Sequence, residues 1–191
     1  MKRILFTAPL LLVIAFLAPA ASAQVTVGVY GDYTRLAETS TNMTGLGARV
    51  GVKVFPMTSL EAQMTYDFDQ AFTEKFTNTT GGVFVNNSNM KILKGLFGPT
   101  FETPGPVKLF VTAKGGFINF SFNAAPGSVS GFTSSVSDLR TNNIHGMFYP
   151  GGGLMAYIGP VGLRLEVGDD MYFANGAHNN LVVQFGPTIR F

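Results

Sequence analysis

Apolar and polar residues alternate with a period of two along most of this chain, and this feature constrains its fold more than any other. In the last segment, one face carries Leu181, Val183, Phe185, Pro187, Ile189 and Phe191, and the other carries Val182, Gln184, Gly186, Thr188 and Arg190. Such alternation is typical of a β-strand with one apolar face. No convincing stripe of apolar residues at helical spacing accompanies it. The sequence therefore predicts an all-β fold.

Eight segments of this kind are expected, at about 25–35, 43–55, 60–69, 90–102, 107–120, 146–158, 161–172 and 180–191. The pattern is mixed around 91–102, where Lys94 and Glu102 share a face with Ile92, and glycines blur it around 147–158. Pro99 and Pro187 fall inside predicted strands. Because proline cannot donate to a strand ladder, we expect a bulge or a strand end at each.

The links between these segments alternate in length. Links at 55–60, 103–107 and 158–161 are short and carry Pro or Gly, whereas 36–42, 70–89, 121–145 and 173–179 are longer and rich in Asn, Thr, Ser and Gly. This alternation places all short turns, and both ends of the mature chain, at one end of the sheet. We therefore predict an eight-stranded antiparallel up-and-down β-barrel.

The first 23 residues have the layout of a cleaved secretory signal peptide. Lys2 and Arg3 precede an uncharged, mostly apolar run over 4–17, and an A-x-A pattern ends at Ala23. The alternative is a membrane anchor, but the run is shorter than the ~20 residues that span a bilayer. We expect cleavage after Ala23, which leaves one barrel domain at 24–191.

Two kinds of barrel share this alternation, and composition distinguishes them. Charged residues make up 13% of the chain, against about a quarter in a soluble domain. A soluble lipocalin-like barrel turns its apolar face inward, whereas a membrane barrel turns it toward lipid. The low charge and the export signal favour the membrane barrel. We therefore expect lipid contact at Val50, Val52, Leu163, Leu165, Val183 and Phe185.

Aromatic residues gather near both ends of the predicted strands. Tyr33, Phe68, Phe117, Phe148 and Tyr172 lie toward the long links, and Phe55, Phe101, Tyr157 and Phe191 lie toward the short turns. Transmembrane barrels carry two aromatic girdles at the membrane interfaces, about 25 Å apart. The positions predict such girdles, although aromatic residues also favour strands in general.

The export signal, the eight segments and the ending 184–191 make the chain resemble the small outer-membrane β-barrel family of Gram-negative-type bacteria, akin to the OmpA-type transmembrane domain and its short relatives. The resemblance implies a multi-pass protein of the outer membrane, in contact with lipid and lipopolysaccharide. Phe191 resembles the terminal signal read by the barrel-assembly machinery. The resemblance is specific for architecture and weak for function, because such folds host many functions.

Nine charged residues fall on the inward parity: Arg49, Lys53, Glu61, Asp67, Lys94, Lys114, Arg164, Glu166 and Arg190. An eight-stranded barrel is only wide enough to be filled by side chains. Unpaired charges there are costly, so these residues are expected to form a salt-bridged plug. The alternative is a narrow pore for ions or small solutes.

Glu166 is expected to anchor this network. A hairpin joined near 173–179 would set Arg164 opposite residue 188, Glu166 opposite residue 186 and Arg190 near residue 162. That register leaves Glu166 without a partner in its own hairpin. Its counter-charge is then expected from across the lumen, from Lys53, Lys94 or Arg49.

Signals for catalysis or metal binding are weak. The only histidines are His145 and His178, there is no cysteine, and neither an HExxH nor a G-x-S-x-G motif occurs. The adjacent Asp169 and Asp170 are interpreted as a solvated pair at the membrane–water interface, with a divalent-cation site as the alternative. The loop serines are Ser128, Ser130, Ser134, Ser135 and Ser137. We expect no cofactor and no metal, and a lipid A-modifying enzyme is the less favoured alternative.

The sequence thus predicts a non-enzymatic outer-membrane barrel with a structural or surface-interaction role, such as adhesion or membrane integrity. An extracellular ligand would bind loops 70–89 and 121–145. The net charge of +2 gives no footprint for nucleic acid. We expect a monomer.

Overall fold

The computed structural model describes residues 24–37, 40–122, 132–136, 139, 143–174 and 176–191. Its strands are β1 (Val25–Leu36), β2 (Thr41–Phe55), β3 (Thr58–Asn78), β4 (Val83–Glu102), β5 (Val107–Phe122), β6 (Phe132–Ser134), β7 (Ile144–Ile158), β8 (Val161–Asp169), β9 (Met171–Phe173), β10 (Ala177–His178) and β11 (Leu181–Arg190). The expected signal peptide at 1–23 lies outside the described residues. Among the described residues, no helix is long and apolar enough to cross a membrane.

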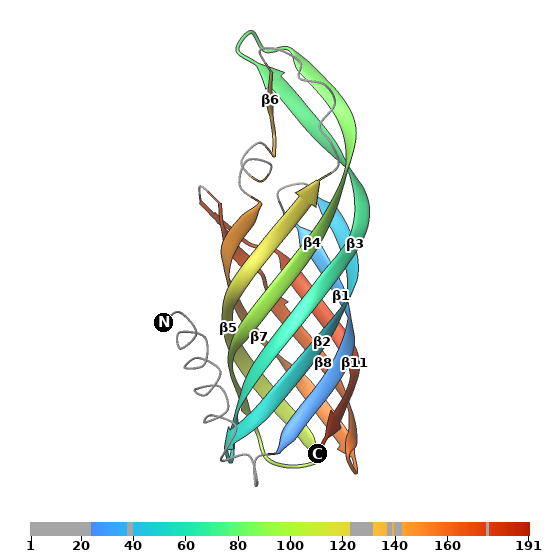
Figure 1. Cartoon of the computed structure of the whole chain (residues 1–191), viewed down its shortest axis with the longest axis vertical. Helices are drawn as coiled ribbons and strands as arrows, with labels where there is room; N and C mark the ends of the chain where they lie inside the picture. The colour runs from blue at the N-terminus through green and yellow to red at the C-terminus, as the bar shows by residue number, and fades with distance from the viewer. Residues whose placement is uncertain (1–23, 38–39, 123–131, 137–138, 140–142, 175) are drawn as a thin grey trace, which may run out of the picture.

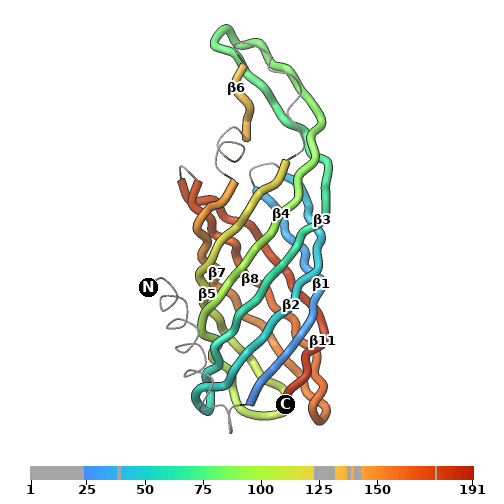
Figure 2. Tube along the Cα trace, viewed as in Figure 1, coloured from blue at the N-terminus to red at the C-terminus, as the bar shows by residue number. Residues whose placement is uncertain are grey.

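Eight of these strands close into a barrel. Each pairs antiparallel with its neighbours in the order β1, β2, β3, β4, β5, β7, β8 and β11, and β11 pairs with β1. β9 continues the line of β8 and pairs with β7. Figure 1 and Figure 2 show the tilted strands of the closed wall. The predicted up-and-down barrel is confirmed, and its short turns lie at the same end as the start of β1 and the end of β11.

The link 70–89 is not a long loop, contrary to the prediction. β3 and β4 continue as a hairpin that pairs as far as Thr77 and Val83, and β6 pairs with its β3 arm. This distal hairpin, residues 70–89, projects beyond the barrel (Figures 1 and 2). A register shift between Asp67 and Gln70 marks where it leaves the wall. Its many Asn, Thr and Ser residues hid the strand pattern, because both of its faces carry polar side chains.

The register of β8 and β11 differs by two residues from the prediction. Arg164 lies opposite Gly186 and Glu166 opposite Gln184. The backbone N–H of Arg190 donates to the carbonyl of Pro160, so Arg190 lies beside residue 160, two residues from its predicted position near residue 162. A shift of two residues leaves every side chain on its predicted face, because side chains alternate with a period of two.

The strand prolines cause no bulge, so that expectation is wrong. Pro99 pairs with Leu60 and Pro187 with Leu163 in unbroken register. On the opposite edge of each strand, the pairing is interrupted next to the proline: β4 is unpaired with β5 around Pro99, and β11 is unpaired with β1 around Pro187. Beyond each gap the pairing resumes in the same register. The glycine before Pro187 makes this possible, because a Cβ on Gly186 would lie 2.1 Å from the carbonyl oxygen of Val29.

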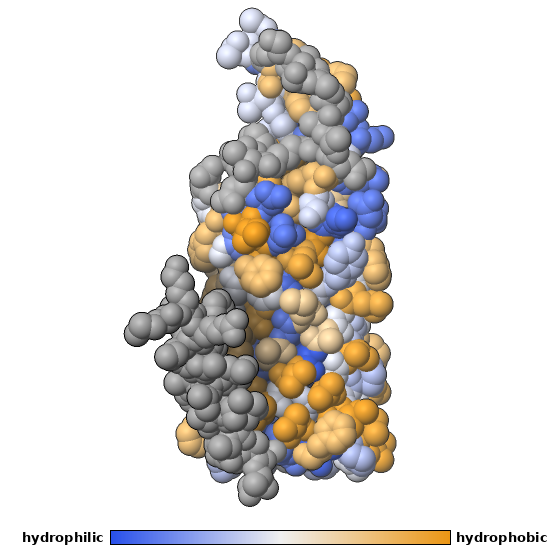
Figure 3. Space-filling model, viewed as in Figure 1, coloured by the Kyte–Doolittle hydropathy of each residue, from blue (hydrophilic) through white to orange (hydrophobic). Residues whose placement is uncertain are grey.

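The wall is apolar outside and charged inside. Val50, Leu163 and Phe185 are 47%, 53% and 56% exposed, whereas Lys114 and Glu166 are fully buried. Val52, Leu165 and Val183 face the same outer side. Figure 3 shows apolar side chains over much of the barrel wall. The predicted facing is confirmed, and it is the reverse of the soluble lipocalin-like arrangement.

Two aromatic residues assigned to the girdles point inward instead. Tyr172 is 1% exposed, and the neighbouring Phe173 takes the outer position at 55% exposure. Tyr157 lines the lumen at the short-turn end. The remaining predicted girdle residues are exposed: Tyr33, Phe68, Phe117 and Phe148 toward the long links, and Phe55, Phe101 and Phe191 toward the short turns. The alternation of side chains along β9 explains why Tyr172 points inward, because its neighbours Met171 and Phe173 point outward.

The lumen has two sections with different fillings. From the short-turn end to the level of Lys94, buried charged residues fill it, and we call this the ionic section. Beyond it lies the apolar section, which holds most of a cluster of Leu36, Met43, Phe72, Met90, Ile92, Leu96, Ile118, Phe120, Val136, Leu139, Met147, Tyr149, Tyr172, Ala174 and Val182. Leu96 and Tyr149 of this cluster lie at the level of the ionic section, where Tyr149 pairs with Lys114. The prediction of a polar lumen therefore holds for only part of its length.

Candidate functional site

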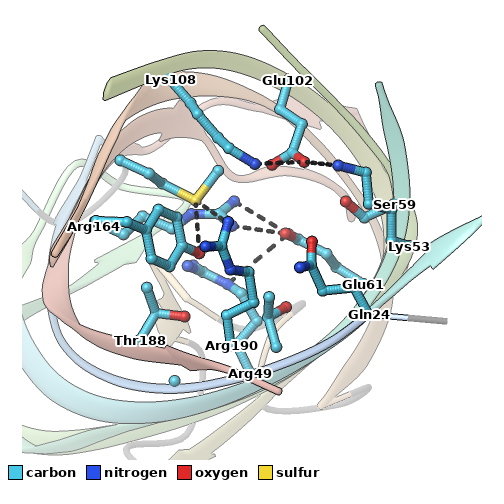
Figure 4. A pocket seen from close by; sticks show the side chains of 14 residues that line it. Gln24, Arg49, Lys53, Ser59, Glu61, Glu102, Lys108, Arg164, Thr188 and Arg190 are labelled. Atoms are coloured by element: carbon cyan, nitrogen blue, oxygen red, sulfur yellow. Dashed lines mark hydrogen bonds and ion pairs between the residues drawn. The ribbon is translucent and has the colours of Figure 1, made fainter. Parts of the chain in front are cut away.

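The ionic section begins at the short-turn end with a small group of charges. Glu102 of β4 accepts ion pairs from Lys53 of β2 at 3.1 Å and from Lys108 of β5 at 2.8 Å. Arg190 of β11 lies over the Tyr157 ring, with its guanidinium carbon 4.9 Å from the ring centroid. We call these five residues the mouth cluster. Figure 4 shows Glu102 between the two lysines.

A central cluster of five residues lies deeper. Arg164 of β8 reaches Glu61 of β3 through Nη1 at 2.6 Å, and it reaches Glu166 through Nη2 at 2.8 Å. Arg49 of β2 binds Glu166 at 2.9 Å. Lys114 of β5 lies 3.0 Å from Glu61 and 3.4 Å from Glu166. Two carboxylates thus hold together three cations from three different strands.

Aromatic rings cover the cations of the central cluster. The Arg164 guanidinium carbon lies 3.9 Å from the Phe110 ring centroid, and that of Arg49 lies 4.7 Å from the Tyr30 centroid. Tyr30 fits because Gly47 has no side chain: a Cβ there would lie 2.3 Å from the Tyr30 ring. Cation–π contacts of this kind stabilise desolvated cations. The inward Phe110, an exception to the polar face in the sequence, therefore has a physical role.

The third group, the carboxylate cluster, surrounds Lys94 of β4. The Lys94 ammonium group lies 3.0 Å from Asp32 of β1, 3.2 Å from Asp67 of β3 and 3.0 Å from Asp170. It also donates to the Thr34 hydroxyl at 2.8 Å. One cation thus stands among three carboxylates.

Two glutamines extend this network: Gln184 connects the central cluster to the carboxylate cluster, and Gln63 bridges two cations within the central cluster. The Gln184 amide donates to Asp32 at 2.9 Å and accepts from Arg49 at 2.6 Å. The Gln63 amide oxygen accepts from Lys114 at 2.7 Å and from Arg49 at 3.2 Å. Every hydrogen bond here joins different strands. The network therefore ties the wall together across the lumen.

Little free space remains among these side chains. A cavity of about 20 Å³ lies at the mouth and another of about 10 Å³ lies between Arg49, Arg164 and Gln184. A cavity needs about 10–15 Å³ to hold one water molecule. The two cavities therefore have room for about one or two water molecules in all.

The structure places all nine predicted charges on the inner face and brings eight of them into ion pairs. The exception is Arg190, whose guanidinium group contacts the Tyr157 ring and forms no ion pair with any described carboxylate. For Glu166, Arg49 does reach it from across the lumen, whereas Lys53 and Lys94 serve other carboxylates. The expectation that its own hairpin offers no partner is wrong, because Arg164 binds it from two residues away.

Four charged members of the network were not among the predicted site residues: Asp32, Glu102, Lys108 and Asp170. Asp170 was expected in a solvated pair with Asp169, but it is 1% exposed and binds Lys94. Only Asp169 lies at the rim, where its carboxylate accepts the Asn180 backbone N–H at 2.8 Å. Strand alternation through 164, 166 and 168 was the available signal, since these residues lie on one side of β8 and Asp170 continues the same parity just beyond its end.

Among the described residues, the two histidines and Ser134 lie apart from the ionic network. His178 stacks on Tyr172 with ring centroids 4.9 Å apart, and His145 lies 6.1 Å from the same ring. The Ser134 hydroxyl donates to Glu74. Ser128, Ser130 and Ser137 lie outside the described residues. Within the described part of the chain, no group of three His, Cys, Asp or Glu side chains is placed to hold a metal ion.

No family model and no curated protein matches this chain, but solved structures match its fold. Neisserial surface protein A gives a TM-score of 0.56 at 11% identity, covering 88% of this chain and 95% of that one. The attachment invasion locus protein Ail of Yersinia pestis, crystallised with the heparin analogue sucrose octasulfate, gives 0.54 at 12%, covering 88% and 97%. OprG of Pseudomonas aeruginosa gives 0.54 at 9%, covering 88% and 95%. The chain has the fold of the small outer-membrane β-barrels.

Proposed function

We propose that this chain is a non-enzymatic outer-membrane protein whose closed barrel holds the distal hairpin outside the cell as a binding element. The observation that carries the proposal is the hairpin itself, with Val83, Phe84 and Val85 exposed near its turn at 62%, 41% and 52%. Exposed apolar patches rimmed by polar residues are typical of interaction sites. Surface attachment is thus favoured over a purely structural role.

The membrane assignment rests on the facing of the wall. A barrel with this outer surface would aggregate in water, whereas lipid solvates it. A gel comparison of boiled and unboiled membrane extract tests it. The folded barrel should migrate differently from the boiled chain. Identical migration, together with recovery from the soluble periplasm, would contradict the assignment.

Export and assembly complete the proposal. We infer that cleavage after Ala23 releases the barrel domain 24–191 and that Phe191 serves as the assembly signal. Phe191 is 75% exposed, and its backbone N–H donates to the Val25 carbonyl at 2.8 Å. N-terminal sequencing of the membrane form should begin at Gln24. Phe191→Ala should lower the yield of heat-modifiable barrel, and Phe191→Tyr should retain it.

Adherence of bacteria that express the chain tests the hairpin. Cells are applied to surfaces coated with fibronectin, laminin or heparin. Combined Val83→Ser, Phe84→Ser and Val85→Ser should abolish adherence at unchanged surface level. The matched control, Asn86→Ser with Asn87→Ser in the same hairpin, should adhere normally. Equal adherence of the triple variant and the parent chain would refute hairpin binding and leave the membrane-integrity role.

A narrow pore is the second candidate, and planar-bilayer conductance separates it from the first. The small cavities and the buried ion pairs favour a closed plug. The purified barrel should therefore give no stable current steps. Stable ion-selective steps would show that the lumen conducts.

A further inference from the structure

The cavity at the mouth of the barrel carries an excess of positive charge. Five basic side chains line it, namely Arg49, Lys53, Lys108, Arg164 and Arg190, and only two acidic ones, Glu61 and Glu102. Figure 4 shows Lys108, Glu102 and Lys53 in a row, with the guanidinium groups of the three arginines gathered beside them. The lining therefore has three more cations than anions.

The acidic residues of the lining are already shared. Glu102 serves both Lys53 and Lys108, and Glu61 serves Arg164 and Lys114. Arg190 rests on Tyr157, with no carboxylate within ion-pair distance among the described residues. Cations confined inside a protein wall are costly without a counter-charge. An anion in this cavity would supply it.

The arrangement of charge along the lumen fixes where that anion enters and stops. Beyond the central cluster lies the carboxylate cluster, in which Asp32, Asp67 and Asp170 surround the single Lys94. Its three carboxylates offer an anion no attraction, and the apolar section lies beyond it. Lys53, at the mouth, has a side chain that is 27% exposed. The site is thus open only toward the short-turn end.

We propose that this mouth binds a carboxylate group that enters from the short-turn end. The cavity of about 20 Å³ has room for one or two oxygen-sized atoms. That space suits the two oxygens of a carboxylate. A guanidinium group presents paired N–H donors that match a carboxylate. Arg190 offers such a group, and the Ser59 hydroxyl and the Gln24 amide line the same cavity.

The test follows the unfolding midpoint of the refolded mature chain in a zwitterionic detergent while sodium acetate replaces sodium chloride at constant ionic strength. Acetate should raise the midpoint and saturate, and its neutral isostere acetamide should not. Arg190→Gln should raise the half-saturating acetate concentration roughly tenfold, which corresponds to the loss of about one charge-assisted hydrogen bond. Arg35→Gln, an exposed residue at the far end of β1, is the matched control and should respond as the parent chain does.

A second variant and a peptide probe complete the test. Lys53→Gln should also weaken the acetate response, which keeps the test decisive if Arg190→Gln does not refold. An acetylated dipeptide with a free carboxyl terminus, compared with its amide, distinguishes a peptide carboxylate from a free small acid. An acetate response equal to that of chloride would overturn the proposal. An acetate response unchanged in both the Arg190 and Lys53 variants would also overturn it.

Discussion

The ionic and apolar sections of the lumen are enclosed by the same strands but are stabilised in different ways. In the ionic section, buried charges such as Glu166 bind partners from across the barrel at 2.9–3.4 Å. In the apolar section, residues such as Ile118 and Phe120 are buried against one another without charge. The first depends on matching charge and the second on matching shape. A neutral isostere should therefore damage the first, and a smaller side chain the second.

The largest effect is expected from Glu166→Gln. The change preserves shape but leaves Arg49, Arg164 and Lys114 with the single carboxylate of Glu61. Breaking a buried ion pair from one side costs on the order of 3–5 kcal/mol. Urea unfolding in detergent should show this loss. A second change, Arg49→Met, should restore part of it, and an unchanged midpoint for Glu166→Gln would mean that the ionic section is hydrated.

A somewhat smaller effect is expected from Ile118→Ala in the apolar section. Ile118 is fully buried, and truncating a buried Ile to Ala costs about 2–5 kcal/mol because it leaves a cavity. The control is Ile118→Val, which should cost about 0.5–1.5 kcal/mol. The same urea titration measures both. An equal loss of unfolding free energy in the two variants would show that the side chains of the apolar section are not closely packed.

Leu165→Arg tests the lipid-facing side of the wall, directly next to the buried Glu166 of the ionic section. Leu165 is exposed on the outside of β8, at 36%. An arginine at the bilayer midplane costs about 2–4 kcal/mol, so assembly into membranes should fall, as it should for Val52→Arg. Leu165→Val serves as the control. Normal membrane yield of both arginine variants would mean that this surface does not face lipid.

The smallest effect is expected from Arg190→Gln. Arg190 belongs to the ionic section, but among the described residues its guanidinium group contacts the Tyr157 ring and no carboxylate. A partly exposed cation–π contact contributes about 0.5–1 kcal/mol. Without added carboxylate, the unfolding midpoint should shift only slightly. A loss as large as that of Glu166→Gln would place Arg190 inside the ion-pair network.

Strands and their facing could be predicted from the sequence because both depend on local alternation. The two-residue error in the β8–β11 register did not change the face of Arg164 or Glu166. The distal hairpin could not be predicted, because Asn86, Asn87 and Ser88 give no apolar face. The apolar section was also missed, since Ile92 and Leu96 share the inward parity with Lys94 and made the pattern look mixed.

Partners across the lumen could be predicted only in part. Arg49 was one of three candidates for Glu166, and parity alone could not choose among them. The choice depends on how the strands are staggered around the barrel, which sets the height of each side chain along the axis. Asp170 was misjudged for a related reason, because its pairing with Lys94 joins residues 76 positions apart.

The long sequence separation of the lumen contacts has a consequence for biogenesis. Gln184 and Asp32 are 152 positions apart, and Arg164 and Glu61 are 103 apart. The network is therefore incomplete until the final strand has been delivered and joined to the first. A half-made sheet would present bare charges on one side and apolar side chains on the other. Such a sheet is costly in lipid unless its inner side is covered, so we expect closure of the barrel to accompany its insertion.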